Sequence, residues 1–306
     1  MLRPVSGDAE LHQVARVEGG LVNTIYRVTI DGGASYAVRV YAAGSQVFWT
    51  ERRLLTRLAG RLPVPQILFA DACGRRCAYP YLVYQWIEGI SLNECRRRNS
   101  PETFVKLAEP LGQLLARIAH TTLPAGYIDR KIQVEALLER ACEQLREGLA
   151  RERLGTVLAD GLLDCLKRSA PALCALDDVS VLVHGDFGGR NILVSVEESG
   201  EWGISGVIDW EEAAAGSALW DVGSLFRYPR RYSAEFRALF EKGYRAEGGE
   251  LSPDWWPVAR TCDAMRLVAI LNEERELPGV FAECAELIRS IVSGSRSDDV
   301  LINHPT

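Results

Sequence analysis

The chain has 306 residues, of which 47% are hydrophobic and 25% are charged, and its formal net charge is −6. This composition is ordinary for a globular protein, and the length favours two lobes or domains. The negative charge argues against nucleic acid or an anionic membrane as the main partner. No apolar run reaches about eighteen residues and no signal peptide begins the chain, so we expect a cytoplasmic protein without a membrane partner.

The first ninety residues are typical of a β-rich lobe. Alternating apolar residues predict strands over 12–18, 24–30, 35–41, 65–70 and 79–86. The turn Asp31-Gly32-Gly33 predicts a hairpin between the second and third strands. One helix is predicted over 46–59, with Glu51 on the same face as three leucines. Residues 87–90 are interpreted as a connector.

From residue 91 the pattern favours helices. We expect a long helix over 102–120, which Pro110 should kink, and a helical stretch over 131–176, broken near Gly155 and Gly161. A small group of strands then follows at 179–183, 191–196 and 203–210. Further helices are predicted at 233–247, 254–275 and 279–292, and the polar tail, residues 295–306, is expected to be flexible.

The eight cysteines are scattered through both parts of the chain. The closest two, Cys73 and Cys77, have no second pair at a spacing that would complete a metal site. Reduced, structural thiols are therefore favoured over disulfides or zinc ligands.

The stretch VLVHGDFGGRNILV, residues 181–194, places polar residues and glycines between two apolar runs. Glycine, aspartate and asparagine favour turns, so this is a short loop held at both ends by strands. Asp186 and Asn191 have the Asp-x-x-x-x-Asn spacing of a kinase catalytic loop, and Asp209 lies near the end of the strand predicted over 203–210. Each piece alone is also compatible with a plain turn or strand end.

The combined pattern resembles the aminoglycoside phosphotransferase family, small-molecule kinases with the protein-kinase fold. It consists of His184-Gly185-Asp186, then Asn191, then Ile208-Asp209-Trp210-Glu211. The resemblance covers most of the chain and implies an α+β, bilobal protein-kinase-like fold. Its N-terminal nucleotide-binding lobe, residues 1–86, would hold a five-stranded antiparallel sheet and one helix. The connector 87–90 would lead to a mainly helical C-terminal lobe, residues 91–294, with the catalytic loop and the acceptor site.

The chemistry of phosphoryl transfer explains why these residue types are needed. The enzyme mainly positions the acceptor and neutralises the charge that spreads over the transferring group. We assign Asp186 to bind the acceptor hydroxyl and take its proton. Asn191 and Asp209 offer oxygen ligands suited to Mg²⁺, and the hairpin predicted between them brings them together. His184 and Asp221 are expected to brace the loop.

Nucleotide contacts, to ATP or GTP, are expected on the N-terminal lobe. Residues 18–24 lie where kinases place a phosphate-covering loop, and the resemblance assigns Gly20 and Asn23 to it, although a plain hairpin turn fits as well. Adenine contacts of Gln85, Trp86 and Ile87 are implied by the resemblance alone.

Arg39 occupies the strand position where protein kinases carry a phosphate-binding lysine, and no lysine precedes Lys106. Arginine can hold both a phosphate and a carboxylate. Glu51, on the apolar face of its helix, would be costly to bury without a cation, so we predict that Arg39 pairs with Glu51. The alternative is a surface ion pair unrelated to nucleotide.

The sequence says least about the acceptor. Candidate acceptor contacts, besides Asp186, are Arg190, Glu211, Asp263, Glu273 and Glu274. A second acidic group, Glu135, Glu139, Glu143 and Glu147, forms one helical stripe. For this stripe, and for Asp263, Glu273 and Glu274, a solvated helix face is favoured over an acceptor site. The sequence leaves open whether the chain is a monomer or a dimer.

The sequence is compatible with three functions. The first is a Mg²⁺-dependent kinase that phosphorylates a hydroxyl of a small, cationic, aminoglycoside-type antibiotic and so confers resistance. The second is a metabolic kinase on the same scaffold, with an amino alcohol, amino sugar or amino acid as acceptor. The third is a catalytically dead nucleotide-binding regulator, against which the intact Asp186, Asn191 and Asp209 argue.

Overall fold

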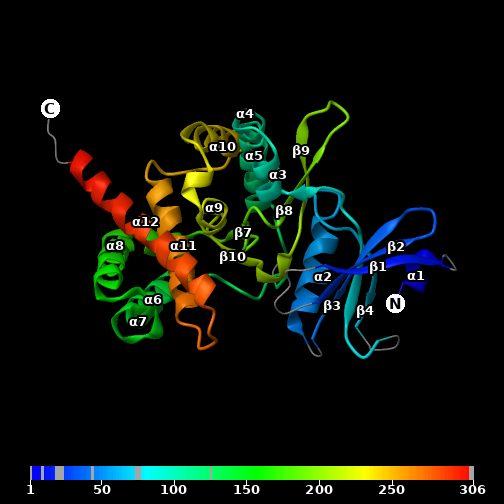
Figure 1. The fold of residues 1–306 in the computed structure, drawn as a ribbon, viewed down its shortest axis with the longest axis horizontal. Helices are drawn as coiled ribbons and strands as arrows, with labels where there is room; N and C mark the ends of the chain where they lie inside the picture. The colour runs from blue at the N-terminus through cyan, green and yellow to red at the C-terminus, as the bar shows by residue number, and fades with distance from the viewer. Residues whose placement is uncertain are drawn as a thin grey trace. The chain divides into compact units, whose positions relative to one another are not determined.

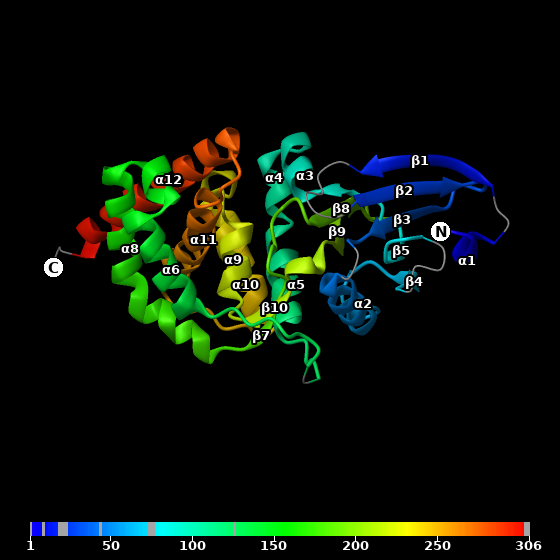
Figure 2. The ribbon, with the colours of Figure 1, turned by 90° about the horizontal axis from the view of Figure 1, so that it is seen from below.

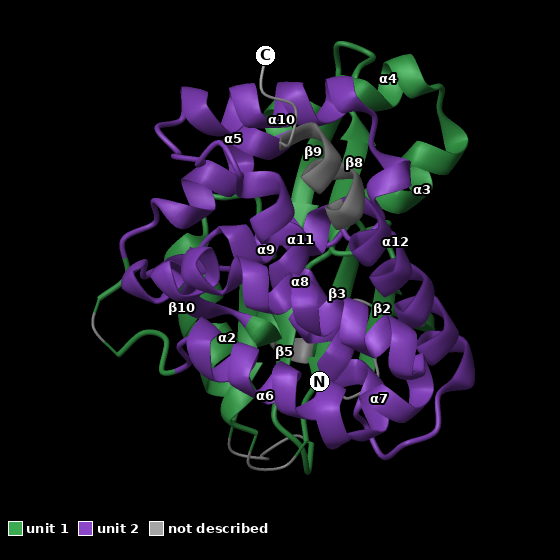
Figure 3. Ribbon diagram, turned by 90° about the vertical axis from the view of Figure 1, so that its left-hand side faces the viewer, with its two compact units in different colours: residues 1–110, 123–129, 189–212 green, residues 111–122, 130–188, 213–306 purple. Residues whose placement is uncertain are grey.

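A computed structural model of the chain describes residues 2–7, 10–17, 24–42, 45–72, 77–124 and 126–302, and for 3–4 and 295–302 it describes the backbone only. The chain forms two compact units, coloured separately in Figure 3. Unit 1 comprises residues 1–110, 123–129 and 189–212, and unit 2 comprises residues 111–122, 130–188 and 213–306. The boundary between Gly188 and Gly189 falls inside the predicted catalytic loop.

The main sheet of unit 1 is the predicted one (Figure 1). It consists of β1 (Leu11–Val17), β2 (Thr24–Ile30), β3 (Ser35–Val40), β4 (Ile67–Asp71) and β5 (Tyr81–Gln85), in the order β1-β2-β3-β5-β4. All neighbouring strands are antiparallel. The strand ends lie within two residues of those that the alternating pattern predicts.

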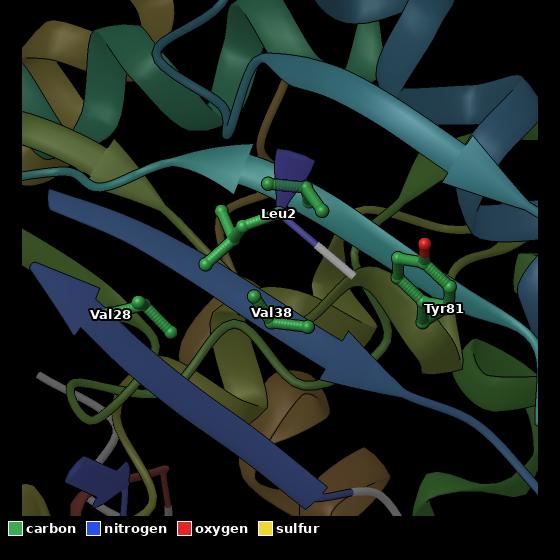
Figure 4. Close-up of a cluster of buried hydrophobic side chains, with 5 residues drawn as sticks. Leu2, Val28, Val38 and Tyr81 are labelled. Atoms are coloured by element: carbon green, nitrogen blue, oxygen red, sulfur yellow. The ribbon is translucent and has the colours of Figure 1, made fainter. Parts of the chain in front are cut away.

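The two faces of this sheet carry different side chains. Leu2, just before α1 (Arg3–Ser6), packs with Val28, Val38, Tyr81 and Val83 on one face (Figure 4). Because side chains alternate along a strand, Arg39 points to the opposite face. There it meets α2 (Gln46–Leu58), whose buried side chains include Glu51.

A second, three-stranded sheet of unit 1 carries the polar motif. It has the order β6-β8-β9, with β6 (Ile90–Ser91), β8 (Ile192–Val196) and β9 (Trp202–Val207), and η2 (Trp210–Glu212) follows it. Two helices, α3 (Leu92–Arg98) and α4 (Pro101–Val105), come after β6. The hydroxyl of Ser91 caps α3 by accepting a hydrogen bond from the amide of Glu94 at 3.2 Å.

Unit 2 is mainly helical. Its helices are α5 (Ala108–Ala119, from residue 111 on), α6 (Val134–Glu147), α7 (Leu149–Leu154), α8 (Thr156–Cys174), η1 (Ala175–Asp178), α9 (Leu219–Leu225), η3 (Pro229–Arg231), α10 (Ala234–Ala246), α11 (Trp255–Leu271) and α12 (Pro278–Ile302). In Figures 1 and 2, α8 and α11 lie beside both α6 and α12. Two short strands, β7 (Val181–Val183) and β10 (Ala214–Gly216), pair antiparallel.

Several helix boundaries differ from those expected. The helix predicted over 102–120 is two helices, interrupted at Lys106–Leu107, and Pro110 lies in the first turn of the second, where its missing amide hydrogen costs nothing. Gly161 does not break α8. This glycine lies where α8 packs closely against α12, since an added Cβ would lie 2.9 Å from Cγ1 of Val292. The break occurs at Gly148 instead, besides the expected one at Gly155.

The three strands predicted around the motif do not pair with one another as a single group. β8 and β9 form the predicted hairpin, but β7 pairs with β10, a strand that the sequence pattern did not indicate. Helices α3 and α9 were not expected either, and α12 continues to Ile302. The flexibility of the tail and the lobe boundaries remain predictions.

The seven cysteines among the described residues are free thiols, as expected. In the same part of the chain, no helix has both the length and the apolar character needed to cross a bilayer.

The contact between α5 and α10 yields a stability prediction. A Cβ on Gly112 would lie 2.7 Å from the backbone nitrogen of Tyr244 and nearer still to the carbonyl oxygen of Phe240. Backbone atoms cannot turn away as a side chain can, so we expect Gly112→Ala to lower the free energy of unfolding by about 3 kcal/mol, measured by urea denaturation.

Gly279→Ala is the matched control, since Gly279 is also helical and nothing lies within 4 Å of its Cβ position. Alanine has the higher helix propensity, so this variant should be neutral or stabilised by up to about 1 kcal/mol. Equal effects of the two substitutions would contradict the packing described for α5.

Candidate active site

The β8–β9 hairpin brings Asn191 and Asp209 to the same end of one sheet, as predicted. Ile192 pairs with Val207, and the amide of Ile208 donates a hydrogen bond to the carbonyl oxygen of Asn191 at 2.9 Å. Asn191 is buried, whereas the side chain of Asp209 is 35% exposed. The hairpin therefore fixes both residues although 18 positions separate them in the sequence.

The guanidinium of Arg39 binds three carboxylates within unit 1. Its Nη1 lies 3.2 Å from Oε1 of Glu51 and 2.9 Å from Oδ1 of Asp209. Its Nη2 lies 2.5 Å from Oε2 of Glu211. The predicted Arg39–Glu51 pair is confirmed, and it is buried, so the alternative of a surface ion pair is wrong.

Two tyrosines complete the surroundings of Glu51. The hydroxyl of Tyr41 donates to Oε2 at 2.7 Å, and that of Tyr84 donates to Oε1 at 3.3 Å. The two hydroxyls are also 2.7 Å apart. Both oxygens of the buried carboxylate therefore have partners, which a charged group out of contact with water requires.

Burial and neighbouring charges shift the pKa values of Glu51 and Arg39 in opposite directions. Burial raises the pKa of Glu51, and the neighbouring Arg39 offsets part of that rise. For Arg39, burial would lower the pKa, but Glu51, Tyr41 and Asp209 outweigh it and the pKa lies above its usual value. Arg39 is thus a permanent cation whose position three carboxylates determine.

Asp209 has an unusual backbone conformation. It is the only residue other than glycine with a positive φ, 67°, in the described parts of the chain. Aspartate tolerates the left-handed region better than most residues, yet such a conformation persists only where the surroundings hold it. The hairpin on one side and η2 on the other supply that constraint.

The donor set at this end of the hairpin fits a magnesium ion. Carboxylate and amide oxygens are hard ligands, and Mg²⁺ is held by one or two protein carboxylates together with waters and substrate phosphates. Nowhere in the described residues do three or more His, Cys, Asp or Glu side chains form a metal cage. Asn191 and Asp209 could therefore supply two oxygen ligands to Mg²⁺.

The residues predicted to bind the cofactor lie in different surroundings. A cavity of about 350 Å³ is lined by Gln85 and Trp86, but also by Tyr36, which packs on the sheet face opposite to Arg39. This cavity is thus not on the side where Arg39 would hold phosphates. Ile87 packs against Gly206, since a Cβ on Gly206 would lie 2.8 Å from Cδ1 of Ile87. Gly20 and Asn23 lie outside the described residues.

Unit 2 holds the other half of the motif on a rigid loop. The buried carboxylate of Asp221, on α9, accepts hydrogen bonds from the amides of His184 at 2.6 Å and Gly185 at 2.9 Å. Nδ1 of His184 accepts one from the amide of Asp186 at 3.2 Å. Both residues brace the loop as expected. Burial raises the pKa of Asp221, and His184 is the main influence opposing the rise.

The tight turn of the loop lies at its first glycine. Gly185 has a φ of 86°, which only glycine adopts readily, whereas Gly188 and Gly189 have no positive φ. Gly189 is instead required by crowding, because an added Cβ would lie 2.7 Å from Oδ1 of Asn93.

Asp186 itself is nearly buried, and its Oδ1 has two partners from unit 2. Oγ of Ser224 donates to it at 3.4 Å, and Nη2 of Arg266 lies at the same distance. Neither partner is predicted from the sequence, because both lie more than 35 residues downstream and no motif marks them.

The predicted acceptor residues are in contrasting environments. Asp263 is 3% exposed and forms a bidentate pair with Arg227, with Nη2–Oδ1 at 2.7 Å, so its charge is already compensated. Glu273 and Glu274 are exposed and line a cavity of about 590 Å³ together with Arg140, Gln144, Ala269, Asn272 and Arg275. In unit 1, Arg190 is exposed and Glu211 is held by Arg39.

Residues 13–256 match the model of the phosphotransferase enzyme family, which is about four fifths of the chain. The chain belongs to this family. A curated relative, the viomycin phosphotransferase of Streptomyces vinaceus, is 32% identical over 149 residues, which are 48% of this chain. The alignment spans about half the length of that relative (49%).

Solved structures of other phosphotransferases share the fold. The GDP and kanamycin complex of APH(2″)-IIia has a TM-score of 0.74 at 17% identity, with 96% of this chain and 97% of that chain covered. A ternary complex of APH(4)-Ia with ADP and hygromycin B has a TM-score of 0.67 at 18% identity, covering 95% and 96%. The macrolide 2′-phosphotransferase MphH of Brachybacterium faecium has a TM-score of 0.66 at 16% identity, covering 94% and 95%.

These likenesses establish an α+β, protein-kinase-like fold for this member of the phosphotransferase family. They also explain the order of its elements: a five-stranded sheet with α2 comes first, and the Asp186 loop and the β8–β9 hairpin follow. The residue contacts, in contrast, come from this chain alone.

The Arg39 cluster yields a prediction about stability. Arg39→Met would leave the buried Glu51 without its cation, so we expect the free energy of unfolding to fall by about 3–5 kcal/mol. Arg27→Met on the adjacent strand is the control, because Arg27 pairs with an exposed Glu88 at 3.1 Å and should change stability by less than about 1 kcal/mol. If the free energy of unfolding, measured by urea denaturation, fell by a similar amount in the two variants, the claim that buried Glu51 depends on Arg39 would be refuted.

Proposed function

We propose that the chain transfers the γ-phosphoryl group of ATP or GTP to a hydroxyl of a small cationic antibiotic. The observation that carries the proposal is the Asp186 loop, whose peptide groups are fixed by the buried Asp221 so that one carboxylate is held in a defined place. Within the phosphotransferase family, such a carboxylate suits the acceptance of a proton from an attacking hydroxyl.

In the proposed reaction the acceptor oxygen forms a bond to the γ-phosphorus, and the bond from that phosphorus to the bridging oxygen breaks. The hydroxyl proton goes to the carboxylate of Asp186, and the nucleoside diphosphate leaves with the bridging oxygen. Asp186 orients the hydroxyl as well as receiving its proton, which is how positioning lowers the barrier.

Arg39 is proposed to bind nucleotide phosphates, with Glu51 and the two tyrosines holding its side chain in place. Its always-charged planar group can contact phosphate and carboxylate together. Asn191 and Asp209 would hold a bound Mg²⁺, which supplies charge neutralisation for the phosphates. The cluster of one guanidinium and three carboxylates has an excess of negative charge, which favours a divalent cation.

The cationic nature of the acceptor rests on the cavity beside Glu273 and Glu274. Its volume of about 590 Å³ suits a small molecule, and the two exposed carboxylates can meet ammonium groups. Arg140 and Arg275 line the same cavity, so these carboxylates share it with two cations. The curated relative named for viomycin, and the solved phosphotransferase complexes that hold kanamycin or hygromycin B, support an antibiotic as the acceptor class. We propose resistance to such a compound, in the cytoplasm, as the biological role.

The test is incubation of the purified chain with Mg²⁺, ATP or GTP, and each of viomycin, kanamycin, hygromycin B and a macrolide. We expect one of them to gain the mass of a phosphoryl group in mass spectrometry. Amino alcohols, amino sugars and amino acids are included in parallel. A phosphoryl mass gain on one of these compounds alone would show that the acceptor is a metabolite and not an antibiotic. Absence of transfer to every compound would refute the proposed function and favour a nucleotide-binding regulator.

Variants separate the roles of the two aspartates in the same assay. Asp186→Asn should lower kcat by about 10²- to 10⁴-fold, because the proton acceptor is lost, and leave Mg-nucleotide affinity within twofold. Asp209→Asn should weaken Mg-nucleotide binding at least about tenfold in calorimetry, the scale on which even outer partners of a metal act. Asp164→Asn, at an exposed position of α8, is the control and should change neither. Full turnover by Asp186→Asn would overturn the mechanism.

A further inference from the structure

A second arginine, Arg266 on α11, contacts the loop that carries Asp186. Its Nη1 donates a hydrogen bond to the carbonyl oxygen of Gly185, and its Nη2 lies 3.4 Å from Oδ1 of Asp186. The guanidinium carbon is also 5.5 Å from the ring centre of Trp220. One side chain therefore holds both the carboxylate and the peptide unit that precedes it.

Close packing of α9 against α11 makes these contacts possible. A Cβ on Gly223 would collide with the carbonyl oxygen of Ala259, so the two helix backbones approach each other at a glycine. From α9, Asp221 binds the amide side of the loop, and from α11, Arg266 binds the carbonyl of Gly185. The peptide units around Gly185 are thus fixed by opposite charges from two helices.

The position of Arg266 is electrostatically costly. Only 19% of its side chain is exposed, and burial, followed by the nearby Arg227, lowers the pKa of its guanidinium. Asp186, Asp263 and Asp221 raise the pKa of Arg266 and so oppose this effect. Asp263 is itself bound by Arg227. A buried ion network is rarely the most stable solution for a protein core, so the cost suggests a functional reason.

We propose that Arg266 is a positioning residue for Asp186. Two bonds from one planar group restrict both the rotation of the carboxylate and the direction of the Gly185 peptide. The charge of Arg266 remains after Asp186 receives the acceptor proton, so Arg266 neither gains nor loses a proton in the step. This inference rests on the proposed function, since it assigns Arg266 to act through the proposed proton acceptor.

The test combines two substitutions at Arg266 with the Asp186→Asn variant. Arg266→Met removes both contacts, and Arg266→Lys keeps the charge but not the planar pair of donors. We expect kcat for the acceptor identified in the mass-spectrometric assay to fall about 30- to 100-fold in Arg266→Met and less in Arg266→Lys, while KM for Mg-nucleotide stays within twofold. Arg260→Met is the control on the same helix, because Arg260 bonds Ser290 of α12 at 2.9 Å.

The double variant distinguishes positioning from general destabilisation. If Arg266 acts through Asp186, then Arg266→Met should lower kcat less than threefold in an Asp186→Asn background. An undiminished loss in that background, or a kcat of Arg266→Met equal to that of the wild type, would overturn the inference.

Hydrogen–deuterium exchange supplies a readout that does not depend on turnover. The amides of residues 184–186 should exchange at least tenfold faster in Arg266→Met than in the wild type, with no change in Arg260→Met. If the wild type phosphorylates none of the compounds, the proposed function fails, and the exchange rates then decide whether Arg266 holds this loop. Unchanged exchange would refute the inference even if the enzyme is active.

Discussion

The buried charge of Arg39 is the constraint on which unit 1 depends. A guanidinium that is 4% exposed needs compensation, and the strand that carries it offers none. Glu51 comes from α2, and Asp209 and Glu211 come from the segment after β9, so one cation draws together three separate parts of the chain. The same contacts place the aspartate that we propose as a metal ligand beside the group that we propose for phosphate.

Unit 2 uses the same physical arrangement for a different purpose. Asp186 stands on a loop between an acidic helix residue, Asp221, which binds amides, and a basic one, Arg266, which binds a carbonyl. Each unit thus fixes one aspartate of the motif through an arginine that is distant in sequence. Phosphoryl transfer gains from fixed charges of this kind, because they need not reorganise when the reaction occurs.

The sequence predicted features whose signal is local. Alternation located the five strands of the main sheet, and the spacing from Asp186 to Asn191 marked the loop. The Arg39–Glu51 pair followed from the cost of burying a carboxylate on an apolar helix face. Arg266, Ser224 and β10 were missed because their roles arise from long-range packing, which leaves no periodicity or spacing. Pro110 and Gly161 were misread because position within a helix, and not residue type alone, decides whether a helix breaks.

Calorimetric titration of Arg39→Lys with AMP-PNP and Mg²⁺ tests whether Arg39 organises the nucleotide site. Lysine keeps a charge that can pair with Glu51, but a single ammonium lacks the planar fork that reaches Asp209 and Glu211 at the same time. We expect at least about tenfold weaker binding of the Mg-nucleotide than in the wild type, with a similar midpoint of urea unfolding. Affinity equal to that of the wild type would contradict the claim that this arginine organises the nucleotide site.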